Sequence, residues 1–176
     1  MGGALATLTL VVATVEGAGL RLQHTASLPK GVYRVVRGTP PARLLKPGAI
    51  GLWCLPSGVA EWANARGYLR PGRCPSGVEP LAKMVLATTG DTVDFDGSGV
   101  RVGGRVMPYT QPVLRDAAGR SLTPVPFGRY VLRAGQAWVW SPYTPRSFDS
   151  RYIGPLPPST LIGVVRPVLT LPARRP

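Results

Sequence analysis

The chain has 176 residues, a length that fits one domain, with or without a small insertion, and excludes a multidomain assembly. Hydrophobic residues make up 44% and charged residues 16%, which is too apolar for a disordered chain, while 22 Gly and 20 Pro predict many turns. The formal net charge of +13 would attract nucleic acid or anionic lipid headgroups, but the basic residues stand singly, so a solvated basic surface is the simpler interpretation.

An apolar run occupies the amino end from Ala4 to Val15 and is followed by Glu16 and small residues. It is shorter than the roughly 20 residues that a membrane-spanning helix needs, and it lacks the basic start of a secretory signal. Three interpretations stay open: an anchor whose start lies upstream, a marginal membrane helix reaching Leu20, and a buried core helix. We expect residues 1–20 to form a short apolar helix and a candidate membrane anchor, and residues 21–176 to form the main domain.

Alternating apolar residues, β-branched side chains and flanking Pro and Gly predict a series of short strands. These strands are expected at 31–37, 49–55, 80–89, 92–95, 100–107, 129–133, 136–141 and 160–168. A short helix is expected at 59–69, and residues 108–127 are expected to be irregular. The pattern predicts a mainly β fold of mixed sheets or a partly closed barrel.

The two cysteines, Cys54 and Cys74, lie twenty positions apart beside proline-containing turns. They cannot form a structural zinc site without further ligands, and the only histidine, His24, is distant in sequence, so no metal is expected. A disulfide closing an insertion of about residues 54–76 would stabilise the fold by roughly 3 kcal/mol in an oxidising compartment. Two buried thiols in a reduced protein are the alternative.

Lys83 is one of three lysines, and it alone has apolar neighbours on both sides in an expected strand. Burial disfavours the ammonium form and lowers a lysine pKa from about 10.4, which makes the amine a usable general base near neutral pH. The alternative is that the stem packs while the amine reaches water.

Ser27 lies in a tight turn made by Pro29 and Gly31, directly before an expected strand. A nucleophilic hydroxyl needs such exposure, together with nearby backbone N–H groups that stabilise an oxyanion by roughly 3 kcal/mol each. A structural turn serine is the alternative. His24 is in the same loop, where alignment on the serine with a supporting carboxylate is rarely achieved, so Lys83 is the better candidate base.

Ser147, Asp149 and Arg151 form a third cluster, in a loop before the last expected strand. A serine hydroxyl there can fix the direction of a lysine amine, and an Asp–Arg pair can hold the loop. An ordinary salt-bridged loop is the alternative.

Together and in this order, the three regions resemble the Ser/Lys class of type I signal peptidases, in particular the TraF-like branch of conjugative transfer. The resemblance runs from about residue 25 to residue 168. The motifs that carry it are Thr25-x-Ser27-x-Pro29-x-Gly31-x-Tyr33, Pro80-Leu81-x-Lys83-x-Val85-x-Ala87-x-x-Gly90-Asp91-x-Val93 and Ser147-x-Asp149-Ser150-Arg151-Tyr152-x-Gly154-Pro155.

This resemblance implies that Ser27 is the nucleophile and Lys83 its base. Thr25 and the Ser27 amide would stabilise the oxyanion, Ser147 would orient the lysine, and Asp149 would support activity or brace its loop. Arg151 would pair with Asp149 in that loop.

The resemblance also implies a β-rich catalytic core at the outer face of the cytoplasmic membrane, facing the periplasm, which agrees with a Cys54–Cys74 disulfide. The substrate would be an exported precursor such as a pilin. Its acyl group would pass from the serine to water, which is hydrolysis, or to the substrate's own amino terminus, which gives a cyclic product. No cofactor and no nucleic acid would be required. The amino-terminal segment is shorter and more acidic than a family anchor.

Two other functions were weighed against this one. A basic β-barrel that binds nucleic acid would use the net charge and aromatic residues near arginines, namely Tyr130, Trp138 and Trp140. A self-cleaving, repressor-like protein would need a DNA-binding domain for which the chain has no room.

Overall fold

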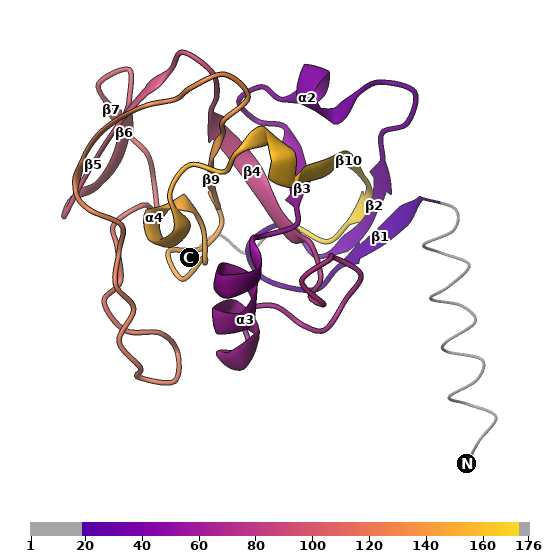
Figure 1. Ribbon diagram of the computed structural model, residues 1–176, viewed down its shortest axis with the longest axis horizontal. Helices are drawn as coiled ribbons and strands as arrows, with labels where there is room; N and C mark the ends of the chain where they lie inside the picture. Colours follow the sequence, from indigo (N-terminus) through magenta and orange to yellow (C-terminus); the bar gives the residue numbers. More distant parts are fainter. Residues whose placement is uncertain (1–18, 173–176) are drawn as a thin grey trace.

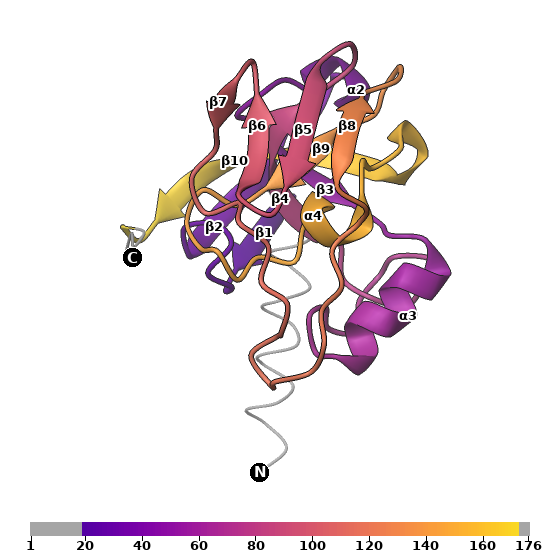
Figure 2. The same cartoon turned by 90° about the vertical axis from the view of Figure 1, so that its left-hand side faces the viewer.

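The computed structural model describes residues 19–172, and in this part of the chain ten strands form two sheets (Figures 1 and 2). The large sheet has the strand order β1 (Leu20–Gln23), β2 (Gly31–Val35), β10 (Leu161–Thr170), β3 (Ile50–Trp53), β4 (Leu81–Ala87) and β9 (Trp138–Trp140). The small sheet has the order β7 (Arg105–Val106), β6 (Gly99–Val102), β5 (Thr92–Asp96) and β8 (Gly128–Val131). The helices are α2 (Pro41–Leu44), α3 (Ser57–Ala65), α4 (Ser150–Ile153) and the 3₁₀ turn η1 (Pro158–Thr160).

The prediction of a mainly β fold is confirmed, and each strand expected from the sequence pattern is present. The sheets are simpler than expected, because every strand pair between residues 19 and 172 is antiparallel. The expected strand 100–107 is divided into β6 and β7 by Gly103 and Gly104, whose φ angles of 57° and 78° suit glycine. Strand β1 and helices α2 and α4 were not expected.

Buried apolar residues form three clusters that connect the elements around the sheets. One cluster joins the large sheet to α3, and a second joins β4 and β9 to the small sheet. The third lies beneath the turn between β1 and β2, where Leu28 and Tyr33 pack with Ile50, Leu52 and Val165. The middle of that turn and the strand that follows it are therefore packed against the sheet.

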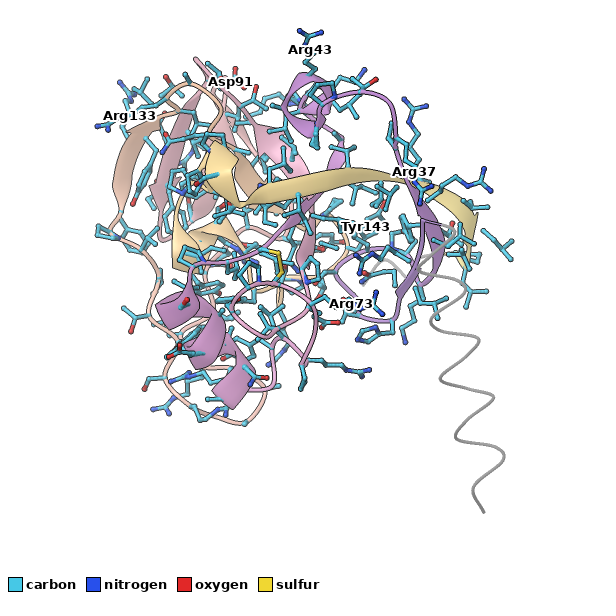
Figure 3. All side chains as sticks on the ribbon, turned by 45° about the vertical axis from the view of Figure 1, so that its right-hand side comes forward. Arg37, Arg43, Arg73, Asp91, Arg133 and Tyr143 are labelled. Atoms are coloured by element: carbon cyan, nitrogen blue, oxygen red, sulfur yellow. A yellow bond between two sulfur atoms is a disulfide. The ribbon has the colours of Figure 1, made fainter. Side chains whose placement is uncertain are left out.

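The insertion between the two cysteines consists of α3 and a following loop. Helix α3 ends at Ala65, earlier than expected, because Gly67 adopts a positive φ of 72° and the N–H of Tyr68 bonds back to the carbonyl of Ala63. Cys54 and Cys74 form a disulfide with a Cα–Cα distance of 5.4 Å, which confirms the predicted bond. The bond appears in yellow in Figure 3.

Residues 108–127, here called the excursion, contain no named helix or strand, as predicted. The excursion descends from the small sheet toward α3 (Figure 2). Among residues 19–172, no helix combines the length and apolarity that crossing a membrane requires. Nearly all of the expected amino-terminal helix lies outside the described residues, and Leu20 begins β1.

Candidate active site

Ser27 and Lys83 lie next to each other although fifty-six positions separate them in the sequence. The Lys83 Nζ is 2.5 Å from the Ser27 Oγ and donates a hydrogen bond to it. Ser27 is in the turn after β1, and Lys83 is in the middle of β4, opposite Gly51 of β3. The proximity required of a nucleophile and its base is therefore present.

The side chain of Lys83 is buried by the residues around it. Leu81, Lys83 and Val85 alternate onto the same face of β4, and Leu81 and Val85 belong to the cluster that packs on α3. Lys83 is 4% exposed. Burial lowers the pKa of Lys83 to about 8, with Asp149 opposing this shift and Arg151 adding to it. The predicted burial is confirmed, and the amine does not reach bulk solvent.

The backbone around Ser27 is fixed by two hydrogen bonds from side chains. The Ser141 hydroxyl, at the end of β9, donates to the carbonyl of Ser27 at 2.8 Å. The Tyr33 hydroxyl donates to the carbonyl of Pro29 at 2.7 Å. Ser141 is 1% exposed, so the bond to the serine turn is shielded from water. Sequence reasoning assigned no such role to Ser141, because a lone serine at the end of an expected strand carries no signal of a partner 114 positions away.

Thr25 is exposed two residues before Ser27 and lines the same groove. Its Oγ1 accepts a hydrogen bond of 2.6 Å from the side-chain amide of Gln23. A hydroxyl that accepts one bond keeps its own proton for donation. Thr25 is thus able to donate toward the groove.

Asp149 and Arg151 form a buried ion pair at the start of α4. The Arg151 Nε lies 2.8 Å from the Asp149 Oδ1, and both side chains are 1% exposed. Arg151 also donates to the carbonyls of Gln111, Pro145 and Ser147, so one guanidinium connects the excursion to the loop before α4. Asp149 caps α4 by accepting from the N–H of Arg151. The predicted Asp–Arg pair is present, and it braces the loop that carries Ser147.

Ser147 is 2% exposed and lines the groove beside Lys83. Its hydroxyl has no hydrogen-bond partner among the described residues. The expected hydrogen bond to Lys83 is therefore not formed in this structure. A buried hydroxyl without a partner is costly, which makes it a ready partner for a group that enters the groove or for a rotated lysine amine.

A cavity of about 750 Å³ contains the Ser27–Lys83 pair. Its walls come from β1, the insertion, β4, the excursion and the loop before α4. His24 lines this groove from an exposed position, and the Ser27 hydroxyl bonds to Lys83. The volume is that of a typical ligand cleft, large enough to hold several residues of a peptide.

Two walls of the groove are joined by a cluster that we call the clasp, made by Arg66, Tyr68, Asp116 and Arg120. The Tyr68 hydroxyl donates to Asp116 at 2.6 Å, and the Nε of Arg120 donates to the same carboxylate at 2.7 Å. Arg66 and Arg120 also reach across to backbone carbonyls of the opposite wall. The hydrogen bond from Tyr68 is the largest of the effects that hold the pKa of Asp116 well below its usual range.

The aromatic residues named for nucleic-acid binding do not form a stacking surface, and that expectation is corrected. Trp138 is 0% exposed and Trp140 is 6% exposed. Both belong to the cluster between the two sheets, with Tyr130 packed against it. Bases stack on aromatic faces that are open to solvent, and the two tryptophans offer none. In residues 19–172, no group of three or more His, Cys, Asp or Glu side chains is arranged to hold a metal ion.

A model of the family described as signal peptidase, peptidase S26, matches residues 4–170 of the chain. The plasmid transfer protein TraF of Escherichia coli is 38% identical over 162 residues, covering 92% of this chain and 88% of that protein. The probable conjugal transfer protein TraF of Sinorhizobium fredii (strain NBRC 101917 / NGR234) is 36% identical, covering 94% and 87%. The conjugal transfer protein TraF of Agrobacterium tumefaciens (strain 15955) is also 36% identical, covering 96% and 92%.

Among solved structures, a signal peptidase I from Enterococcus faecalis V583 aligns with 68% of this chain and with 95% of its own length, with 20% identity and a TM-score of 0.35.

Proposed function

The chain belongs to the peptidase S26 family of signal peptidases, and from that premise we propose that it is a serine endopeptidase in which Ser27 and Lys83 act as a catalytic dyad. The observation that carries the proposal is the 2.5 Å contact between the serine hydroxyl and a lysine amine whose pKa burial lowers to about 8. A neutral amine in that position accepts the proton that a serine must lose to become a nucleophile.

Acylation follows from this geometry. With Lys83 neutral, the serine proton passes to Nζ while Oγ attacks the scissile carbonyl and forms a tetrahedral intermediate. The Ser27 amide and the Thr25 hydroxyl are the donors that would stabilise its oxyanion. Lys83 then gives the proton to the leaving amine, the C–N bond breaks, and an acyl-enzyme remains on Ser27.

Deacylation reverses these roles. Neutral Lys83 accepts a proton from an attacking water, the ester bond to Ser27 breaks, and the proton returns to the serine oxygen. If an amine of the substrate itself attacks instead, the same steps yield a cyclic product. Which nucleophile is held at the acyl carbonyl decides the outcome.

Ser147, Asp149 and Arg151 would act as positioning residues for Lys83. Ser147 and Lys83 line the same groove, and a hydrogen bond between the unpartnered Ser147 hydroxyl and the lysine amine would fix the direction of that amine. Burial is the main cause of the lowered pKa of Lys83, while Asp149 favours the ammonium form and Arg151 disfavours it, so their effects oppose each other. Their ion pair keeps Ser147 in place.

For the substrate we propose an exported precursor of the conjugal transfer apparatus, such as a pilin. Signal peptidases act on exported precursors, and several relatives are named as conjugal or plasmid transfer proteins. The disulfide supports action on the oxidising, outer side of the cytoplasmic membrane. The apolar segment that precedes β1 would be the anchor.

The decisive experiment compares Ser27→Ala, Lys83→Ala and Lys83→Arg in cells that express a candidate pilin precursor. We expect all three to abolish processing while retaining the folded state, and Lys83→Arg to fail because a guanidinium stays protonated. Lys46→Ala is the matched control, since Lys46 is an exposed lysine outside the groove. Mass spectrometry distinguishes precursor, linear product and cyclic product. Wild-type processing by Lys83→Ala would overturn the dyad.

A further inference from the structure

Four segments that are far apart in the sequence each bring one arginine to the groove around Ser27. The four are Arg21 of β1, Arg73 of the insertion, Arg115 of the excursion and Arg146 of the loop before α4. Figure 3 shows Arg73 near the middle of the molecule, whereas Arg43 and Arg133 lie at its outer edges. An excess of basic residues in the chain does not by itself place four of them around one cleft.

The acidic residues of the groove offset only part of this charge, because they are fewer than the arginines. Asp116 is already occupied by Tyr68 and Arg120 in the clasp, and its side chain is only 4% exposed. The carboxylate of Glu79 accepts from the N–H of Arg70. These are the only two acidic residues among those that line the groove, so the charge that faces an incoming peptide is positive.

Arg146 occupies the most informative position of the four. It is exposed, and it directly precedes the buried Ser147 beside Lys83. No hydrogen bond or ion pair engages its guanidinium within residues 19–172, whereas Arg115 is partly used by the carbonyl of Gly119. An exposed guanidinium that lines the groove holding Ser27 and Lys83 presents a planar pair of donors that matches a carboxylate.

We propose that the groove selects acidic peptides, with carboxylates close to the scissile bond paired to Arg146 and Arg115. This inference rests on the proposed peptidase function and names the class of substrate that the same site takes. The carboxylate has two sources, an Asp or Glu side chain beside the cleaved bond or the free carboxyl terminus of a precursor cut near its end. Attraction to the remaining arginines at longer range would guide such peptides to the groove and would weaken with added salt.

The test measures binding apart from chemistry. The full chain carrying Ser27→Ala is titrated into a short, alanine-rich probe peptide bearing an uncharged dye, and affinity is followed by fluorescence anisotropy. Peptides with Asp and with Asn at the flanking positions form one pair, and peptides with free and with amidated carboxyl termini form another. Each pair differs in charge with little change in shape.

We expect the charged member of at least one pair to bind about fivefold more tightly at low salt for each carboxylate that pairs with an arginine. Arg146→Gln and Arg115→Gln, each in the Ser27→Ala background, should reduce that preference, and the double variant should remove it. Arg133→Gln, an exposed arginine outside the groove, should leave it intact. The pair that shows the preference identifies the source of the carboxylate. Thermal melts verify that the variants are folded.

Equal binding of both members of both pairs would overturn the inference, as would a preference that survives in the double variant. Neither result affects the peptidase assignment, which is judged separately by whether Ser27 is needed for cleavage. Conversely, if Ser27→Ala still processed the precursor, the proposed function would be wrong, and the binding preference could still be measured.

Discussion

At the scale of single residues, the position of Lys83 in β4 would be more stable with an apolar side chain, whereas the proposed reaction needs an amine there. An apolar side chain at this position of β4 would suit the cluster around Leu81 and Val85, and the amine is stabilised only by Ser27 and by attraction to Asp149. Below a pH of about 8 the fold must bury an ammonium ion, which costs stability. The same burial lowers the pKa of the amine, so that it is neutral above about pH 8. The cost in stability and the proposed reactivity of Lys83 therefore have the same cause, which is its burial.

The first prediction concerns pH. Since the pKa of Lys83 is about 8, kcat/KM for a peptide substrate should rise with pH and level off above that value, because only the neutral amine accepts the serine proton. A profile that is flat between pH 6 and pH 9, or one with its midpoint near the ordinary lysine value of about 10.4, would contradict this assignment.

The same shift predicts how stability depends on pH. The folded state holds its Lys83 proton less tightly than the unfolded chain, so between about pH 8 and the ordinary lysine pKa of about 10.4 the unfolded chain binds more protons. The Lys83 contribution to the free energy of unfolding therefore rises with pH in that window. Urea unfolding should show this increment in the wild-type protein and not in Lys83→Met, and Lys83→Met should be the more stable of the two near pH 7.

The second prediction tests Ser141 as a positioning residue. Ser141→Ala removes the hydrogen bond to the carbonyl of Ser27, which should free the serine turn and lower kcat about ten- to hundredfold, with KM nearly unchanged. The loss of stability should be about 1 kcal/mol. Steady-state kinetics separates the two constants.

Thr110→Val is the matched control for Ser141→Ala. The Thr110 hydroxyl is also buried and bonds to backbone, but Thr110 lies at the start of the excursion, where it accepts from the N–H of Val100 in β6, and it does not line the groove. It should cost comparable stability and leave kcat intact. If both variants reduced kcat equally, Ser141 would have only a structural role.

At the scale of elements, the sequence pattern predicted the strands well because they either alternate, as β5 does, or are short apolar runs between turn residues, as β3 and β9 are. It failed for β1, since Leu20–Gln23 follows an apolar run that masks any alternation, and the strand is defined by its pairing with β2. It failed for α4 because four residues carry no helical period. The motifs located Ser27, Lys83 and Asp149, whereas Ser141 and the clasp depend on contacts between distant segments that no local pattern encodes.

The third prediction concerns the clasp, which joins the insertion to the excursion across the groove. Tyr68→Phe removes the hydroxyl that bonds to Asp116, and a bond to a charged group of this kind is worth about 1.5–3 kcal/mol. Because the clasp positions two walls and does not contact the dyad, KM for a peptide should rise while kcat changes little. Peptide-cleavage kinetics and urea unfolding measure the two effects.

Tyr130→Phe provides the comparison for Tyr68→Phe. The Tyr130 hydroxyl donates to the carbonyl of Pro126, and Tyr130 does not line the groove. It should leave KM unchanged. A fall in kcat at constant KM for Tyr68→Phe would show that the clasp acts on the dyad itself.

At the scale of the whole molecule, the site is assembled where one face of the large sheet meets three irregular segments. The sheet supplies rigid positions for Lys83 and, through β9, for Ser141, while the insertion, the excursion and the loop before α4 form the walls. Catalytic groups on rigid elements and specificity groups on loops can be altered independently. A change that loosens one wall of the groove should therefore raise KM for a peptide more than it lowers kcat.

The last prediction applies this reasoning to the disulfide, which closes the base of the insertion. Reduction of Cys54–Cys74 opens a loop with a sequence separation of 20, for which chain entropy gives a loss of about 3 kcal/mol and a fall in Tm of about 6–12 °C. Tyr68, Leu69 and Arg73 belong to that loop and line the groove, so KM should rise more than kcat falls. Differential scanning calorimetry and peptide kinetics, each with and without reductant, measure both effects.

The double variant Cys54→Ala/Cys74→Ala separates the bond from side effects of the reductant. It should show the lowered Tm and raised KM of the reduced protein, and added reductant should change neither value further. A Tm that is the same for oxidised and reduced protein would mean that the insertion is held by its other contacts. Those contacts are the clasp and the packing of Leu69 and Val78 in the cluster beneath α3. In that case Tyr68→Phe, and not reduction, would be the change that opens the groove.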